Sequence, residues 1–338
     1  MDSITHIALG AVVGEALLGK SIGKRAMVFG AIAQSLPDFD FMAAFWMTTT
    51  ENILAHRGFT HSFLFMAVTT VLLGYLAWRW HRDKTIPLTT WMLFFAFQIT
   101  IHLLIDACNA YGVGWFEPFS HHRISFNILF VADPFFSIST GIAALVLVFM
   151  NSENRLRSLW VVASLTVSSL YIIYAVYNKV TIDKAVDNSL KEQKITHHGF
   201  FSTPTPLNNW LWFVAAKTDS GFQIGHRSVF ENQTKIEFYY FPQNKSALDT
   251  LKNHEDIQRL IRFSQGYYTV ENRNDTLLFN DLRFGQITGW ATPTEKFVFH
   301  YYLEYPEENQ LVIQRGRFAN WNSETVNVMI EKIWGSKK

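Results

Sequence analysis

Residues 62–80 read SFLFMAVTTVLLGYLAWRW, an apolar run close to the roughly 20 residues that a helix needs to cross a hydrocarbon core about 30 Å thick. The chain carries three more runs of similar length and character, at residues 87–107, 134–150 and 158–177. Two shorter apolar segments precede them, at residues 4–18 and 26–36. The pattern predicts a mainly α-helical membrane bundle of about four long transmembrane helices, with a short N-terminal helical hairpin packed against it.

The composition changes near residue 180, because most of the Lys, Asp, Glu and Asn residues lie downstream. We therefore predict a helical membrane domain at residues 1–178 and a soluble α+β domain at residues 179–338. Alternating or aromatic-rich runs predict strands at residues 221–230, 234–241, 296–303 and 311–315. Amphipathic spacing predicts helices at residues 245–264 and 323–334. Trp210 and Trp212, between the two domains, are expected at the lipid interface.

Net charge and cysteine content narrow the possible partners and sites. A net charge of +1 over 338 residues argues against nucleic acid as an obligate partner. Cys108 is the only cysteine, which excludes an intrachain disulfide and a zinc site built from thiolates. The expected partners are the lipid bilayer and a lipid or lipid-linked substrate.

Basic residues gather at one set of the predicted helix ends. The opposite connections, residues 37–61 and 108–133, contain only Arg57 and Arg123. The positive-inside rule therefore places the basic ends in the cytoplasm, and it predicts that residues 179–338 are extracytoplasmic. The eight basic residues are Lys20, Lys24, Arg25, Arg79, Arg82, Lys84, Arg155 and Arg157.

His102 and Asp106 lie four residues apart in the apolar run ITIHLLID. On a helix this spacing puts both side chains on one face, where an imidazole nitrogen and a carboxylate oxygen can bind the same ion. Burial of such groups among apolar residues costs several kcal/mol unless they are paired or bound to a cation. The alternative is a hydrogen-bonded pair that joins two membrane helices.

The segment HRGFTHS, residues 56–62, predicts a site loop that turns into the first long helix. His56 and His61 are candidate metal-binding or proton-transfer groups, and the planar guanidinium of Arg57 suits a phosphate. Gly58 permits an unusual backbone conformation. The alternative is an ordinary basic loop at the membrane interface.

Asp38 and Asp40 follow the second short apolar segment, directly after Pro37. Proline stops the helix and sets the direction of the two carboxylates, although Pro-Asp is also a common turn signal. His6 starts the first short segment. Taken one by one, Asp38, Asp40 and His6 are only weak evidence for a functional site.

The predicted topology brings these candidates to the same, outer end of the bundle. Convergence at one end is how helical proteins build metal sites, so we predict a divalent metal centre, with zinc as the expected ion and one or two ions per chain. Asp40 is expected to orient a ligating histidine. His121 and His122, in the loop at residues 108–133, could add a ligand or remain at the interface.

The whole set resembles the YdjM-like family of bacterial inner-membrane proteins, which are described as metal-dependent hydrolases. The resemblance covers roughly residues 1–180 and is carried by His6, by PDFD at residues 37–40, by HRGFTHS and by the segment from His102 to Asp106 with Asn109 and Gly112. It implies a multi-pass protein of the bacterial inner membrane.

The ligand order is also similar to that of the zinc-dependent phospholipase C and single-strand nuclease group. This likeness implies a first metal ion held by four residues, with one of them bridging to a second ion that His6 also holds. The four are Asp38, His61, His102 and the bridging Asp106. A second His-to-Glu pair of that group has no clear counterpart here.

These observations predict a membrane-bound hydrolase that acts on a phosphoester or lipid-type substrate through metal-activated water. Arg57 would stabilise negative charge. One alternative is a transporter in which the His and Asp groups relay protons or ions. Another is a non-catalytic scaffold with a closed structural metal site.

Overall fold

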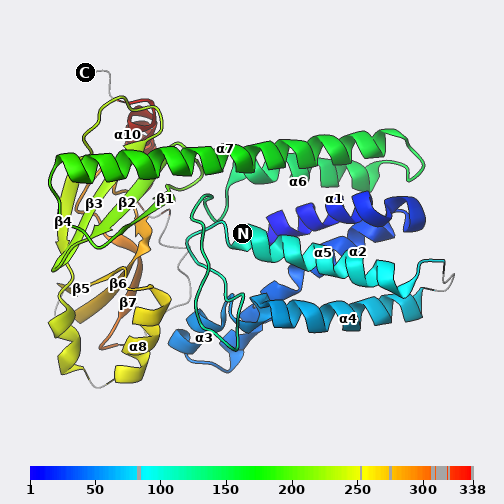
Figure 1. Cartoon of the computed structure of the whole chain (residues 1–338), viewed down its shortest axis with the longest axis horizontal. Helices are drawn as coiled ribbons and strands as arrows, with labels where there is room; N and C mark the ends of the chain where they lie inside the picture. The colour runs from blue at the N-terminus through cyan, green and yellow to red at the C-terminus, as the bar shows by residue number, and fades with distance from the viewer. Residues whose placement is uncertain are drawn as a thin grey trace. The chain divides into compact units, whose positions relative to one another are not determined.

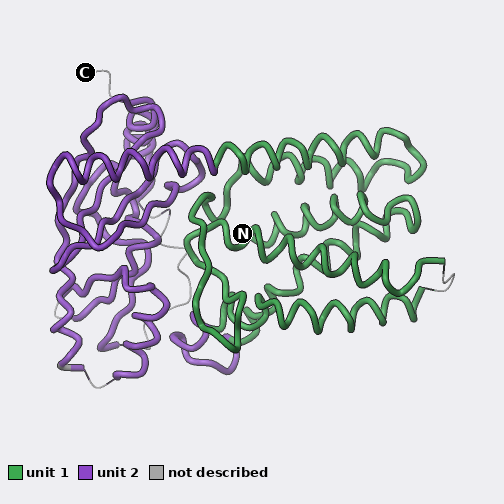
Figure 2. Tube along the Cα trace, in the orientation of Figure 1, with its two compact units in different colours: residues 1–43, 55–175 green, residues 44–54, 176–338 purple. Residues whose placement is uncertain are grey.

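The computed structural model describes residues 1–81, 85–251, 253–273, 276–305, 309, 318 and 320–335. The chain forms two compact units (Figure 2). Met1–Ala43 and Ala55–Ala175 make up the first, and Ala44–Leu54 and Val176–Lys338 make up the second. Arg82 and Lys84, which enter the charge-based orientation, and the predicted strand at residues 311–315 lie outside the described residues.

The first unit is a bundle whose helices run side by side (Figure 1). Short helices connect them at one end, namely η1 (Pro37–Phe45) and η2 (Phe59–His61), with α3 (Thr49–Ala55) between these two along the chain. The long helices are α1 (Ser3–Ile22), α2 (Arg25–Ser35), α4 (Phe63–Trp80), α5 (Leu88–Asp106), α6 (Pro134–Phe149) and the first part of α7 (Leu156–Glu192).

Three of these helices, α4, α5 and α7, are long and apolar enough to cross a membrane, where the sequence predicted about four. The run at residues 134–150 gives α6, which has 16 residues and spans about 24 Å. Asp133 caps this helix, Pro134 is its first residue and Met150 is already extended. The expected fourth long span is therefore a shorter apolar helix.

Helix α7 does not end near residue 177, as predicted, but continues unbroken to Glu192. Its 37 residues contain no proline or glycine that would stop it. In its last part Ile182, Val186 and Leu190 recur every four residues and pack on strand residues of the second unit. The helix continues because this second apolar face has a surface to bury against.

The hairpin of α1 and α2 is closely packed, because glycines meet where the two helices cross. A Cβ atom on Gly10 would lie 2.5 Å from the carbonyl oxygen of Gly30, and one on Gly14 would lie 2.2 Å from that of Ala26. Backbones can approach this closely only where the side chain is a hydrogen atom. The spacing of Gly10 and Gly14 puts both on one face of α1.

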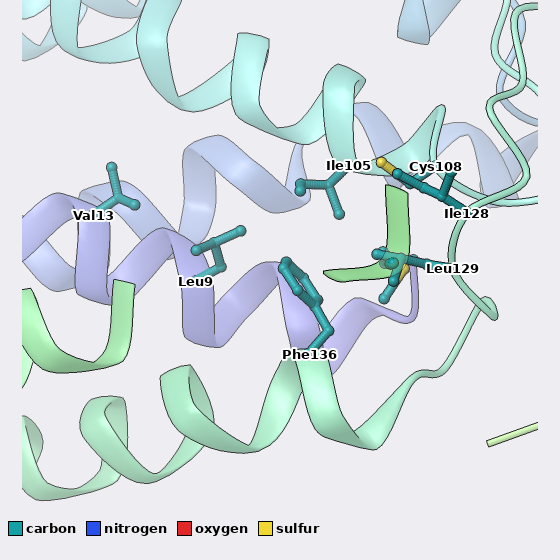
Figure 3. Packing of buried hydrophobic residues seen from close by; sticks show 9 residues of the cluster. Leu9, Val13, Ile105, Cys108, Ile128, Leu129 and Phe136 are labelled. Atoms are coloured by element: carbon teal, nitrogen blue, oxygen red, sulfur yellow. The ribbon is translucent and has the colours of Figure 1, made fainter. Parts of the chain in front are cut away.

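The core beside the helix ends that carry the candidate site joins α1, α5 and α6 with the loop that follows α5. Leu9 and Val13 of α1 face Ile105 of α5 and Phe136 of α6, and Leu129 of the loop is fully buried among them (Figure 3). Apolar burial of this kind is the main stabilising contribution to the end of the bundle that carries the candidate site.

The described residues of the second unit form two antiparallel sheets. The first has the order β1-β2-β3-β4 and the second the order β5-β6-β7. The helices are η3 (Lys245–Thr250), α8 (His254–Phe263) and α10 (Ser323–Trp334). The strands are β1 (Phe200–Pro204), β2 (Leu211–Lys217), β3 (Gly221–Ser228), β4 (Phe238–Pro242), β5 (Tyr268–Arg273), β6 (Thr276–Gln286) and β7 (Phe297–Tyr302).

Strand β2 corrects the prediction that Trp210 and Trp212 lie at the lipid interface. Trp212 is fully buried and packs with Ile182 and Val186 of α7. Phe213, on the other face of the strand, packs with Leu282 of β6. Both faces of β2 are covered, so its sequence shows no alternation of polar and apolar residues and was not recognised as a strand. Trp210 is half-buried against Trp290 and Met329.

Candidate metal centre

Helix α5 supplies two groups of the site from its last turn. His102 and Asp106 are both fully buried and, being four residues apart, lie on the same face. His102 Nδ1 donates a hydrogen bond of 2.6 Å to the carbonyl oxygen of Gln34. Because a carbonyl can only accept, the neutral imidazole carries its proton on Nδ1 and presents a lone pair on Nε2.

The segment before α4 supplies His61, which is also fully buried. The left-handed residue of this turn is Arg57, with φ of 57°, while Gly58 has φ of −88°. The sequence had indicated Gly58 as the residue with the unusual conformation. A non-glycine residue in the left-handed region is costly and is often found at functional sites.

Helix α2 ends at Ser35, and η1 then carries Asp38 and Asp40. Asp40 is buried and lies at the centre of a hydrogen-bond network. Its Oδ1 is 3.0 Å from His56 Nδ1, and its Oδ2 accepts from the backbone N–H of Arg57 at 2.7 Å and from the Thr60 hydroxyl at 3.3 Å. Asp40 therefore holds the HRGFTHS segment in place.

The tautomer of His61 follows from this network. The Thr60 hydroxyl has one hydrogen, which it donates to Asp40. It must therefore accept from His61 Nδ1, which lies 3.0 Å away. His61 thus also presents a lone pair on Nε2, and Asp40 orients it through Thr60 and by its own Oδ2 at 3.4 Å from Nδ1.

Three buried groups and the partly exposed Asp38 converge. Each of Asp38, His61, His102 and Asp106 offers one ligand atom, and these atoms all lie within 4.8 Å of one another. His61 Nε2 is 3.0 Å from His102 Nε2, 3.2 Å from Asp106 Oδ2 and 3.5 Å from Asp38 Oδ1. His102 Nε2 is 3.6 Å from Asp106 Oδ2 and 3.7 Å from Asp38 Oδ1. Ligand atoms arranged tetrahedrally around zinc are roughly 3.4 Å from one another, which is close to the distances between these atoms.

The donor set fits a divalent cation. Two imidazole lone pairs and two carboxylates face one point, and acceptors that face each other in a buried place repel unless a cation lies between them. Oδ2 of Asp106 is buried and accepts no hydrogen bond, although Arg57 Nε lies 3.0 Å from it. Imidazole nitrogen and carboxylate oxygen are ligands that zinc binds commonly.

His6 and Arg57 lie on the other side of Asp106. His6 Nε2 is 3.1 Å from Asp106 Oδ1, its ring is 3.9 Å from that of His102, and its Nδ1 has no hydrogen-bond partner. The α-amino group of Met1 also contacts Asp106. Arg57 is buried, donates to Asn109 Oδ1 at 2.7 Å and stacks on Tyr111. The Oδ2 atom of Asp106 therefore faces His61, and its Oδ1 atom faces His6 and the α-amino group.

The pKa values outside the membrane helices favour ligation. Burial alone would raise the pKa of Asp38, but the hydrogen bond with His61 and the electrostatic influence of the nearby imidazoles of His102 and His6 hold it well below its usual range. Burial lowers the pKa of His61, an effect that Asp38 and Asp40 oppose only in part. An ionised carboxylate and a neutral imidazole are the forms that bind metal ions.

His121 and His122, which the sequence left open, lie elsewhere. Both are exposed, and His121 Nδ1 pairs with Glu117 at 2.8 Å. The structure therefore brings together Asp38, His61, His102 and Asp106, with His6 and Arg57 beside Asp106 and with Asp40 and His56 around His61. Sequence reasoning missed the roles of the Gln34 carbonyl and of Tyr111. Asn109 was noted only as part of the family pattern, although its distance of three residues from Asp106 was a usable signal.

The proteins and the family to which this chain is similar include inner membrane proteins. A family model described as YdjM inner membrane protein matches residues 1–182. The chain is 35% identical over 122 residues to "Inner membrane protein YbcI" of Escherichia coli (strain K12), which covers 36% of this chain and 69% of that protein. It is 27% identical over 302 residues to "Uncharacterized protein YfhP" of Bacillus subtilis (strain 168), which covers 84% of this chain and 87% of that protein. No solved structure matches it significantly.

Proposed function

This chain belongs to the YdjM inner membrane protein family, and from that premise we propose that it is a membrane-bound, metal-dependent hydrolase. The observation that carries the proposal is the convergence of Asp38, His61, His102 and Asp106, each of which presents a metal-binding atom. When bound, a divalent ion such as zinc supplies Lewis-acid chemistry, because it acidifies water and polarises the oxygen of the bond to be cleaved.

The residues around the four ligands support hydrolysis. Arg57 places a buried positive charge 3.0 Å from Asp106 Oδ2, where it would stabilise negative charge on a phosphoryl or acyl group. The side chain of His56 is 33% exposed, and Asp40 orients its Nδ1 at 3.0 Å. His56 is therefore placed to exchange protons with substrate or water, and Asp40 fixes its orientation.

His6 would hold a second ion with Asp106 as the bridge. Its Nε2 lies 3.1 Å from Asp106 Oδ1, while the other oxygen of Asp106 faces the four-residue group. Two ions that share a carboxylate suit phosphoester cleavage, because they stabilise both the attacking and the leaving oxygen. The site lies at the ends of apolar helices, which favours a lipid or lipid-linked phosphoester.

The orientation by basic residues puts the metal centre and residues 179–338 on the extracytoplasmic side of the inner membrane. A cysteine-accessibility experiment with a membrane-impermeant reagent on exposed Ser120 (Ser120→Cys, in a Cys108→Ser background) would test this. Labelling in intact cells is expected, and labelling only after the membrane is opened would reverse the orientation.

The decisive experiment is metal content. We expect one or two zinc ions per chain in detergent-purified protein, measured by inductively coupled plasma mass spectrometry. A His102→Ala/Asp106→Asn variant should lose them. A His121→Ala/His122→Ala variant, altered at two exposed histidines outside the site, should keep them. Screening of phospholipid vesicles for released phosphoester products would then follow.

Each outcome separates the alternatives. Metal bound by the wild-type protein without hydrolysis of any vesicle lipid would favour the scaffold. Absence of metal in every variant, even after zinc is supplied, would overturn the hydrolase and favour a proton relay through the same His and Asp groups.

A further inference from the structure

A second polar site lies toward the other end of α1 and the start of α7. A cavity of about 430 Å³ opens there, and its wall includes Glu15, Lys20, Ser152, Arg155 and Arg157. None of these residues belongs to the metal centre, and Glu15 and Arg157 form a buried ion pair in the wall of the cavity. The cavity is therefore a candidate ligand site that is separate from the metal centre.

Glu15 provides an unfilled acceptor. Its side chain is 8% exposed, and its Oε1 accepts from Arg157 Nε at 2.7 Å. Its Oε2 is buried and has no hydrogen-bond partner among the described residues. Arg157 does not donate to this oxygen in the structure: its NH1 donates to the carbonyls of Leu147 and Met150, and its NH2 donates to the sulfur of Met27.

Gly19 allows the carboxylate to take this position. A Cβ atom at residue 19 would lie 2.6 Å from Cδ of Glu15 and 2.9 Å from its Oε2. The glycine leaves a cradle in which the carboxylate lies against the helix backbone and faces the cavity. Any larger residue would push it away, at little cost to the fold because the end of a flexible side chain can move.

The opposite charge lines the same cavity. Lys20 and Arg155 are exposed cations on its wall, and Ser152 adds a hydroxyl group. Glu153 adds a second acid to the wall, and it is exposed. Val161 and Val162 form an apolar part of the lining, and Val162 is 62% exposed on the apolar surface of α7. The cavity thus offers a buried anionic acceptor in Glu15, a second, exposed acid in Glu153, the two exposed cations and an apolar side that continues along the helix.

We propose that this cavity binds a zwitterionic headgroup of the phosphoethanolamine type. The primary ammonium would donate to Glu15 Oε2, and the phosphate would lie against Lys20 and Arg155. The exposed valine side favours a lipid as the source, because acyl chains would then run along α7. By the predicted orientation this is a lipid of the cytoplasmic leaflet.

The test is lipid retention by the full-length, detergent-purified protein in native mass spectrometry. Phosphatidylethanolamine, phosphatidylcholine and phosphatidylglycerol of the same acyl chains would be offered separately, and soluble phosphoethanolamine would be offered as a competitor. We expect phosphatidylethanolamine to be retained most strongly, because phosphatidylcholine has no N–H donor and phosphatidylglycerol has no amine. Displacement by phosphoethanolamine at low concentration would instead assign a soluble ligand with the same chemistry.

Two variants locate the binding. Glu15→Gln should reduce phosphatidylethanolamine retention about tenfold, which is the difference between a charge-assisted and a neutral hydrogen bond. Gly19→Ala should reduce it similarly by displacing the carboxylate. Glu192→Gln, an exposed acid at the far end of α7, is the matched control and should leave retention unchanged. Zinc content should be the same in all of them, which keeps this test separate from that of the metal centre.

Equal retention of the three lipids, or retention in Glu15→Gln at the wild-type level, would overturn the proposal and leave only non-specific annular lipid. A preference for phosphatidylglycerol over phosphatidylethanolamine would overturn it as well, because the cations alone would then account for binding.

Discussion

Asp40 orients the candidate ligand His61 but is not one of the four candidate ligands itself. It contacts His56, the Arg57 backbone, Thr60 and His61, and it does not belong to the four converging groups. Its negative charge keeps the Nδ1 proton of His61 in place and so leaves Nε2 free for a metal ion. This arrangement makes Asp40 a positioning residue.

We expect Asp40→Asn to lower zinc affinity by roughly 10- to 100-fold, the usual effect of losing a partner behind a ligating histidine. Competition with a fluorescent chelator would measure it. Glu117→Gln is the control, because Glu117 pairs with the exposed His121 outside the site. Unchanged affinity in Asp40→Asn would show that Thr60 alone orients His61.

We expect the protein to lose zinc only in acidic solution, because the pKa values of His61 and Asp38 are lowered. Because the pKa of His61 lies below its ordinary 6.5, a proton competes with metal for this imidazole only in more acidic solution. The lowered pKa of Asp38 acts in the same sense, since its carboxylate stays ionised. The zinc-bound fraction, followed by dialysis and mass spectrometry from pH 8 to pH 5, should have its midpoint below 6.5.

The lowered pKa values of His61 and Asp38 also mean that acid lowers the free energy of unfolding. The unfolded chain binds a proton at His61 below its ordinary pKa and at Asp38 below 3.8, whereas the folded protein resists both protonations. The stability contribution of these two groups is therefore complete near neutral pH and decreases as the pH falls.

In the dialysis experiment, a midpoint of zinc release above pH 6.5 would contradict the burial of His61.

At the scale of the elements, the contact between α1 and α2 sets the distance between these two helices. Helix α1 carries His6, and α2 precedes Asp38. A Cβ atom on Gly30 would lie 2.0 Å from the carbonyl oxygen of Gly10 and 2.7 Å from Nε2 of Gln98. The first of these contacts is with backbone, which cannot turn aside. A larger residue must therefore separate the two helices.

Gly30→Ala is expected to destabilise the bundle by about 1–3 kcal/mol, the usual cost of overpacking. Thermal unfolding in detergent would show a lower midpoint. Gly141→Ala on α6 is the matched control, because no atom lies within 4 Å of a Cβ atom built there. Its midpoint should stay the same or rise slightly, since alanine is the better helix former. Equal midpoints in the two variants would contradict the close α1–α2 packing.

At the scale of the whole molecule, the second unit holds the segment Ala44–Leu54, which lies in the chain between Asp40 and His56. Arg259 of α8 lies 3.2 Å from Glu51 of α3, and Thr50 donates a hydrogen bond to Asp256. Asp256 also accepts from Arg259 at 3.0 Å. This small network joins the segment Ala44–Leu54 to α8 within the second unit.

Arg259→Ala should increase the rate of chymotrypsin cleavage at Phe45 and Trp46 by a few-fold, because partly exposed ion pairs are worth up to about 1 kcal/mol each. The appearance of the cleaved product on gels would measure it. Lys191→Ala, which removes the exposed pair with Asp187 on α7, should leave the rate unchanged. Identical rates in all three proteins would show that α8 does not restrain this segment.

The sequence by itself determined two of the long apolar helices and the set of His and Asp side chains that are candidate ligands. Long apolar runs have few stable alternatives to helices in a bilayer, and the burial cost of His and Asp marks them wherever they occur in such runs. Helices α4 and α5 lie within one or two residues of their predicted bounds, and α10 coincides with its predicted range. The family resemblance was confirmed by the match over residues 1–182.

Only the tertiary structure decided how these parts meet. That α7 continues to Glu192 and that β2 is buried on both faces depend on surfaces supplied by distant segments, which local periodicity does not encode. In the same way, the Gln34 carbonyl and Thr60 assign the protons of His102 and His61 through space. Spacing along one helix predicts which side chains share a face, whereas the point at which four helix ends and loops converge is set by the packing of the whole bundle.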